Sequence, residues 1–129
     1  MINELFYYAS KSLKKKYFNI ISNNDNLLFF VEYNTGNNIM HSLAMSKYDN
    51  TELINYTMSI LKKYNCIDKF LKQKNKYGFT PWEIAIKSNI LNAICIQYWA
   101  DFYYLEDYNL QNISRHVLMI SIWEKFYKN

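Results

Sequence analysis

Apolar residues recur at spacings of three and four along most of the chain, which places them on one face of an α-helix. The first such segment covers residues 1–21, as one helix or two, and the polar residues 22–26 end it. The apolar stretch 27–31 follows; we expect it to be buried and favour helix over strand. Further helices are predicted over 39–46, 51–63, 67–71, 81–87, 90–104 and 110–127. The pattern therefore predicts an all-α fold.

Two of these predicted helices begin after the same kind of signal. Gly78 supplies a positive φ, Thr80 an N-cap hydroxyl, and Pro81 the first helical position, where the missing N–H costs nothing. Upstream, Gly36 precedes Asn38, a candidate N-cap, by the same offset. Two such starts in one short chain predict a stacked helical repeat.

Composition supports one helical domain over residues 1–129. Half of the residues are hydrophobic, which is ample for a core, and two glycines and one proline leave little turn chemistry for β-hairpins. The net charge of +4 is modest, and Lys14–Lys16 are expected to form a solvated helix face. Abundant Asn, Lys, Ile and Tyr indicate an AT-rich genome, so an asparagine that stands where a repeat normally has aspartate, threonine or glycine is interpreted as compositional drift by default. Cys66 and Cys95 lack metal or redox spacing and are expected to be buried free thiols.

The second helix start carries a family resemblance. The residues Asn75, Gly78, Thr80, Pro81 and Ala85 resemble the ankyrin-repeat motif, with Trp82 in place of leucine and Glu83 in place of histidine. The upstream copy is similar to the same motif at Gly36, Met40, His41 and Ala44. The two glycines lie 42 positions apart, whereas the family period is about 33. We therefore expect an insertion in the loop after Ser46 or in the linker after Tyr64.

The resemblance implies a division of the chain into stacked units. Residues 34–74 would form a repeat with the insertion, and residues 75–108 a second repeat. Residues 1–33 would form a degenerate repeat or N-terminal cap, and residues 109–129 a C-terminal capping helix. Small ankyrin proteins of large DNA viruses or intracellular parasites are similar in brevity and composition, and some of them modulate host signalling.

Catalytic chemistry is not indicated by the sequence. The only histidines are His41 and His116, and neither lies in a pattern typical of nucleophilic or metal chemistry. The resemblance implies that His41 braces its turn through hydrogen bonds. We expect no enzyme activity, no metal and no cofactor.

Protein binding is what the resemblance implies instead, through the loop tips and the short inner helices. The variable positions of the motif give the candidate partner-binding residues Asn34, Thr35, Asn37, Met45, Ser46, Lys76, Tyr77, Phe79, Lys87 and Ser88. Tyr77 and Phe79 are the main candidates, because exposed aromatic residues often dominate binding energy. The alternative is that both pack against neighbouring repeats.

Two other functions remain open from the sequence. The chain could be an assembly subunit that forms homodimers or part of a larger complex, or a nucleic-acid accessory protein using Lys14–Lys16 and the lysines from Lys62 to Lys76. The partner is expected to be a protein, with nucleic acid disfavoured and no membrane association. No secretory signal is visible near Met1, so we expect a cytoplasmic protein, or a nuclear one by diffusion.

Overall fold

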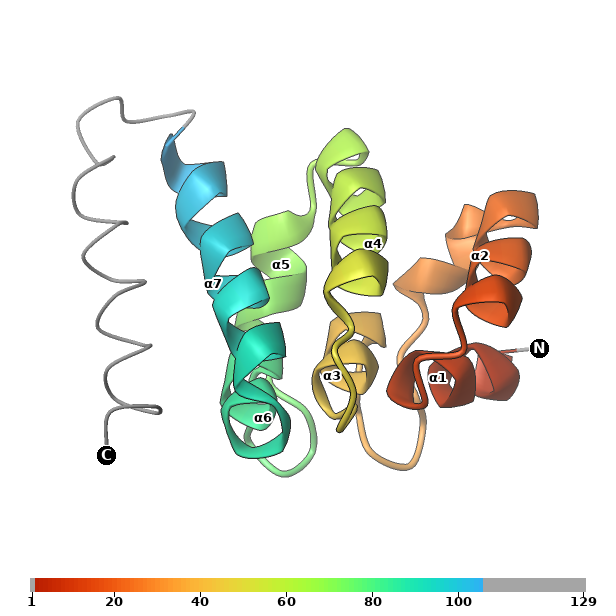
Figure 1. The fold of residues 1–129 in the computed structure, drawn as a ribbon, viewed down its shortest axis with the longest axis horizontal. Coiled ribbons are helices and arrows are strands. Elements are labelled where there is room, and N and C mark those ends of the chain that lie inside the picture. Colours follow the sequence, from red (N-terminus) through yellow and green to blue (C-terminus); the bar gives the residue numbers. More distant parts are fainter. Residues whose placement is uncertain (1, 106–129) are drawn as a thin grey trace.

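The computed structural model describes residues 2–105, and within them all regular structure is helical (Figure 1). The elements are α1 (Ile2–Ser10), α2 (Lys14–Asn23), the 3₁₀ helix η1 (Asp25–Phe29), α3 (Ile39–Ala44), α4 (Thr51–Lys63), α5 (Ile67–Lys72), α6 (Pro81–Ser88) and α7 (Ile90–Leu105). The predicted all-α class is confirmed for this range. The predicted helix 110–127, its capping role and His116 lie outside the described residues.

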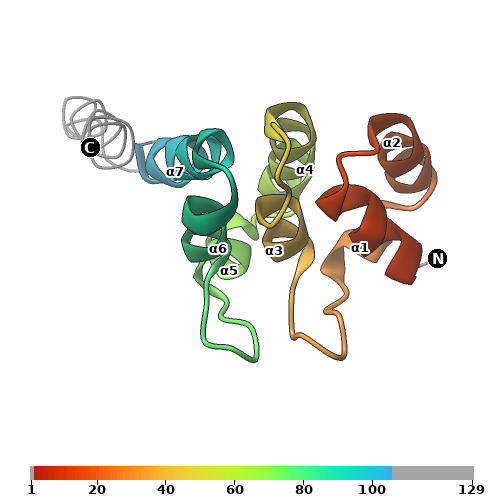
Figure 2. The ribbon, with the colours of Figure 1, turned by 60° about the horizontal axis from the view of Figure 1, so that its bottom comes forward.

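Three helix pairs, α1 with α2, α3 with α4 and α6 with α7, stand side by side. Figure 2 shows α1, α3 and α6 in one row and α2, α4 and α7 in another, with two loops extending from the first row. The core lies between the rows and includes the fully buried side chains of Leu5, Ile21, Leu43, Ile54, Leu61 and Ala85. Because α3 lies between α1 and α6, all six of its residues are buried.

The N-terminal apolar segment forms two helices because the chain reverses at Ser12. This residue has a φ of 58°, in the left-handed region, and the amide of Leu13 donates to the carbonyl of Tyr8. Of the aromatic residues on α2, Tyr17 is completely buried and shares a 2.6 Å hydrogen bond with the hydroxyl of Thr57 on α4. The first pair is thereby fixed to the second.

The predicted starts of α3 and α6 are confirmed. Asn38 accepts a hydrogen bond from the His41 amide, and Thr80 accepts one from the Glu83 amide. In each helix the third residue also accepts a hydrogen bond from the cap amide, which completes a capping box. Gly78 has the expected positive φ, 86°.

Two segments bear on expectations that the sequence left open or placed in the core. In the stretch 27–31, Leu27 and Leu28 are buried on η1, but Phe29, Phe30 and Val31 are exposed, so burial of the whole stretch was wrong. The linker after Tyr64 contains α5, whose Ile67 and Phe70 enter the core. This extra helix follows α4, at one of the two places proposed for the insertion.

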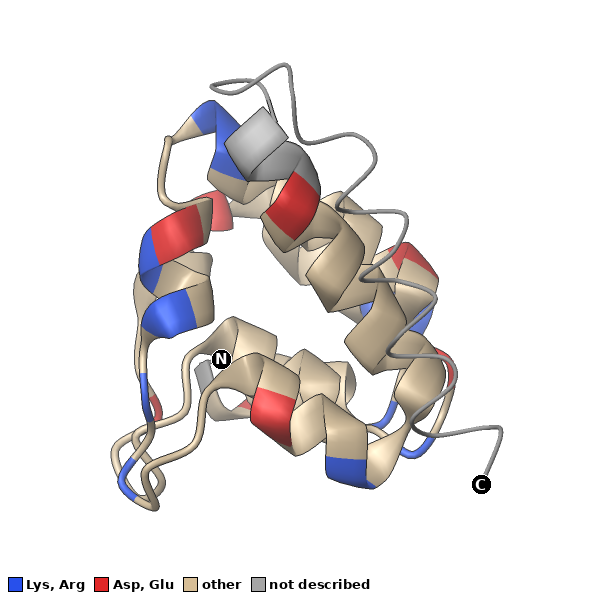
Figure 3. Ribbon diagram, turned by 90° about the vertical axis from the view of Figure 1, so that its left-hand side faces the viewer, with Lys and Arg blue, Asp and Glu red and all other residues tan. Residues whose placement is uncertain are grey.

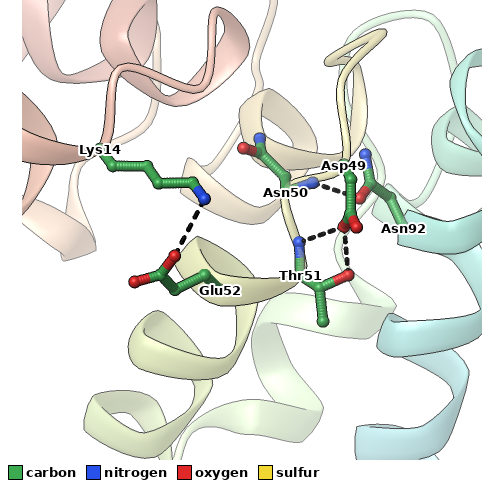
Figure 4. Close-up of polar contacts among 6 residues, drawn as sticks. All are labelled: Lys14, Asp49, Asn50, Thr51, Glu52 and Asn92. Atoms are coloured by element: carbon green, nitrogen blue, oxygen red, sulfur yellow. Dashed lines mark hydrogen bonds and ion pairs between the residues drawn. The ribbon is translucent and has the colours of Figure 1, made fainter.

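Buried asparagines join the three pairs. The side-chain amide of Asn50 donates to the carbonyls of Ala9 and Leu43 at 2.8 and 3.0 Å. The backbone amide of Asn50 donates to the side-chain oxygen of Asn92 at 2.7 Å (Figure 4). Asn92 in turn donates to the carbonyl of Tyr48 at 2.9 Å. Both side chains are fully buried. These two asparagines therefore have a structural role that composition does not indicate.

Candidate binding surface

Two loops lie next to each other at one side of the helix pairs, and we call residues 30–38 and 73–80 the loop pair (Figures 1 and 2). The amide of Lys76 donates to the carbonyl of Thr35, and the side-chain amide of Asn75 donates to the side-chain oxygen of Asn37, both at 2.9 Å. Gly36 allows this close approach, because a Cβ atom there would lie 2.9 Å from the Lys76 nitrogen. The two loops are therefore a single connected surface.

Each loop is also closed by its own hydrogen bonds. In the first, the amide of Glu32 donates to the carbonyl of Asn37, and the amide of Gly36 donates to the carbonyl of Glu32, both at 2.8 Å. In the second, the Asn75 side-chain oxygen accepts from the amides of Tyr77 and Phe79 at 3.0 Å. The loop backbones are thus held in place without any partner.

His41 connects α3 to the second loop from inside the molecule. Its Nδ1 accepts a hydrogen bond from the Asn38 amide at 3.0 Å, so in the neutral ring the proton is on Nε2, which donates to the Phe79 carbonyl at 2.8 Å. Burial lowers the pKa of His41 below its usual value, although the bond to Phe79 acts in the opposite direction. The bracing role implied for His41 agrees with this geometry.

The candidate partner-binding residues fall into three groups. Asn34, Met45, Lys76, Tyr77 and Lys87 are exposed, and Thr35, Phe79 and Ser88 are partly buried. Phe79 lies beneath Lys87, whose Nζ is 4.3 Å from the ring centroid.

Asn37 and Ser46 are buried, and their assignment to the binding surface was wrong. Asn37 is only 5% exposed, because its side chain points at Asn75 and joins the loops. The Ser46 hydroxyl accepts a hydrogen bond from the amide of Tyr48 within the turn after α3. Since α3 is also buried, the inner helix of this unit adds little to the surface, and the loops supply most of it.

Tyr33 is the exposed residue that the motif did not identify. Its side chain is 87% accessible, and the Nζ of Lys76 from the other loop lies 4.8 Å from its ring centroid. Its exposure could have been predicted from its place just before Asn34, in a polar segment that precedes Gly36. The motif identifies only residues close to the glycine and therefore did not include Tyr33.

The remaining reactive groups are dispersed. Among residues 2–105, no three His, Cys, Asp or Glu side chains come together in a way that could hold a metal ion. Cys66 and Cys95 are free and partly buried, not fully buried as expected. Burial raises the pKa of Cys95 to about 12, so its thiol is protonated at neutral pH and is a poor nucleophile. No helix in the described range could span a bilayer.

Comparison with known proteins gives no relative. No family model matches the chain, and no curated protein or solved structure matches it either. The ankyrin resemblance therefore stays a prediction, and the properties of the loop pair are the basis for a functional proposal.

Proposed function

We propose that the chain is a non-enzymatic protein-interaction module of ankyrin type, and that a partner protein binds at the loop pair. The observation that carries this proposal is Tyr77, which is 69% exposed on a loop whose backbone is already fixed. An aromatic side chain presented in this way buries a large area and loses little conformational freedom on binding. Tyr33 extends the same surface from the neighbouring loop.

The arrangement of the helices supports the ankyrin-type part of the proposal. In both α3/α4 and α6/α7, a loop containing a glycine with positive φ leads into a capped inner helix, and an outer helix follows. The offset of 42 residues that separates Gly36 from Gly78 also separates Asn50 from Asn92. Both asparagines are buried and donate to a backbone carbonyl of the preceding helix pair, a recurrence that supports a repeat.

A pull-down tests the proposal. The immobilised full chain, the double variant Tyr33→Ala with Tyr77→Ala, and the control Tyr48→Ala are each incubated with lysate of the source cell. Bound proteins are then quantified by mass spectrometry.

The control residue Tyr48 is 62% exposed but lies in the turn after α3, away from the loop pair. We expect at least one protein to be retained by the wild type and the control and reduced about tenfold or more by the double variant, a typical loss for two hot-spot residues. Equal retention by all three folded proteins would contradict the proposal.

A homo-oligomeric assembly subunit is the second candidate, and an apolar strip on α7 favours it. Leu91 and Tyr98 are about half exposed and lie seven residues apart, so they share a helix face. Ile94 and Cys95 lie between them beside Asn55 of α4, where these residues line a shallow hollow. Light scattering distinguishes the two candidates: a mass above that of the monomer, reduced by Leu91→Ser with Tyr98→Ser, would favour assembly.

A further inference from the structure

Lysines dominate the edge of the molecule next to the loop pair. From Lys62 to Lys76 the chain contains six lysines and a single acid, Asp68. Figure 3 shows the lysine positions passing from the end of α4 through α5 into the second loop along one edge. Asp68 pairs with Lys72 at 3.2 Å, whereas no ion pair engages Lys69, Lys74 or Lys76 within the described residues. This edge therefore carries an excess of positive charge, although Lys74 also lies within electrostatic reach of the Glu83 carboxylate on α6.

The extended segment after α5 separates its polar residues onto two sides. Gln73 accepts a hydrogen bond from the Asn38 side chain, and Asn75 bonds to Asn37, so both are directed toward the first loop and α3. Lys74 and Lys76 alternate with them and are exposed. Since side chains of an extended chain alternate between two sides, Gln73 and Asn75 direct Lys74 away from the first loop. Lys76 begins the turn that follows, and its Nζ lies over the Tyr33 ring.

We propose that the partner of the loop pair contributes an acidic segment containing apolar side chains. Its carboxylates face Lys69, Lys74 and Lys76, and an apolar side chain packs against Tyr33 and Tyr77. This inference rests on the proposed function and adds the chemistry of the partner. Charge complementarity of this kind accelerates encounter and fixes the register of binding, while the aromatic residues supply the buried area.

A protein segment fits this surface better than a nucleic acid does. Asp68 and Glu32 interrupt the basic edge and would repel a uniformly charged phosphate chain, whereas a peptide can place neutral residues opposite them. Base stacking needs open aromatic faces, but Lys76 covers one face of Tyr33 and Lys87 covers one face of Phe79. The exposed apolar side chains of Phe30 and Val31 at the start of the first loop also suit contact with aliphatic side chains.

Selection from a phage-displayed library of random 12-residue peptides tests the partner chemistry. The targets are the full chain, the charge-reversed variant Lys74→Glu with Lys76→Glu, and the control Lys11→Glu with Lys15→Glu, whose residues lie in the turn after α1 and on α2. All four lysines are exposed, so the substitutions leave the core intact, and circular dichroism verifies the fold. The most enriched peptide is then synthesised, and its affinity for these three proteins and for Tyr33→Ala with Tyr77→Ala is measured by fluorescence anisotropy.

The wild type and the control should enrich peptides that combine Asp or Glu with aromatic or aliphatic residues. Affinity of the best peptide should fall about tenfold in the Lys74/Lys76 variant and less than about twofold in the control. Enriched peptides that lack acidic residues, but whose binding is lost when Tyr33 and Tyr77 are replaced, would contradict the proposed acidic partner and leave the proposed function standing. Failure to enrich any tyrosine-dependent peptide would contradict both. Binding of a 20-nucleotide oligo(dT) that weakens steeply with salt would replace the acidic peptide with a nucleic acid.

Discussion

At the residue scale, the two glycines have equivalent positions but unequal surroundings. Both have positive φ, 73° at Gly36 and 86° at Gly78, so a side chain at either position costs about 1–2 kcal/mol in backbone energy. A Cβ atom at Gly36 would also lie 2.9 Å from the Lys76 amide nitrogen, whereas the space around Gly78 is open.

We therefore predict that Gly36→Ala lowers the free energy of unfolding by at least about 1 kcal/mol more than Gly78→Ala does, because of the added overlap. Urea denaturation of the two variants measures this difference, and each serves as the control for the other. Equal losses would mean that the loops separate without cost and that their contact is not important for stability.

His41 should make stability depend on pH. Burial lowers its pKa in the folded protein below the usual value of 6.5, so the unfolded chain binds more protons in this range. Its contribution to stability is therefore complete above about pH 6.5 and is lost as the pH falls from there through the lowered pKa of the folded state. Protonation of Nδ1 would also place a donor against the Asn38 amide.

The measurement is urea denaturation at several values between pH 7.5 and pH 5, for the wild type and for His41→Gln. The wild type should lose stability over this interval, and the variant, although less stable at pH 7.5, should lose less. His116 and the carboxyl groups are common to both proteins, so the difference isolates His41. An equal loss of unfolding free energy with falling pH in the two proteins would contradict the prediction.

At the element scale, asparagine side chains connect one helix pair to the next. Asn92, at the start of α7, accepts a hydrogen bond from the backbone amide of Asn50 and donates one to the Tyr48 carbonyl. The side chains of Asn50 and Asn92 are both fully buried. Asn92→Ala would leave these backbone groups without partners. We predict a loss of about 2–3 kcal/mol. The exposed Asn34→Ala is the control and should change stability by less than about 0.5 kcal/mol. A small loss for Asn92→Ala in thermal or urea denaturation would show that water replaces the side chain.

Most elements could be predicted from the sequence because their signals are local. The caps Asn38 and Thr80, the glycine before each, and the apolar spacing of α4 and α7 all act within a few residues. The stretch 27–31 could not be assigned correctly, since the exposure of Phe30 depends on where η1 directs the chain.

The candidate surface was predictable only in part, for the same reason. Tyr77 and Lys76 follow from their place in the motif. The burial of Asn37 arises from a contact with Asn75, 38 residues later, that no local pattern contains. The membership of Tyr33 in the binding surface similarly depends on its contact with Lys76 of the other loop, 43 residues later.

At the scale of the whole molecule, the links between pairs predict cooperative unfolding. Asn50 bonds to carbonyls of the first and second pairs, and Tyr17 bonds to Thr57 across the same boundary. In a stack of repeats, such interfaces carry much of the stability, so one pair should not unfold alone. Of the three tryptophans, Trp82 and Trp99 report on the third pair and Trp123 lies outside the described residues, while circular dichroism reports on all helices.

We predict that tryptophan fluorescence and circular dichroism give the same urea midpoint in the wild type. In Asn50→Ala, which removes the bonds to Ala9 and Leu43, the two midpoints should separate, because the first pair is then held less firmly. Separate midpoints already in the wild type would contradict strong coupling between the pairs.

The buried asparagines also give the stack a direction along which it can grow. The Asn50 side chain donates to the Ala9 carbonyl in the last turn of α1, and the Asn92 side chain donates to the Tyr48 carbonyl in the turn between α3 and α4. The groups that they bind in the preceding helix pair are backbone carbonyls, which any residue provides. A tandem duplication of residues 50–91 would therefore bring its own asparagine and find an acceptor in the preceding pair. A gene for this protein could lengthen by whole units of 42 residues without first having to evolve a new interface.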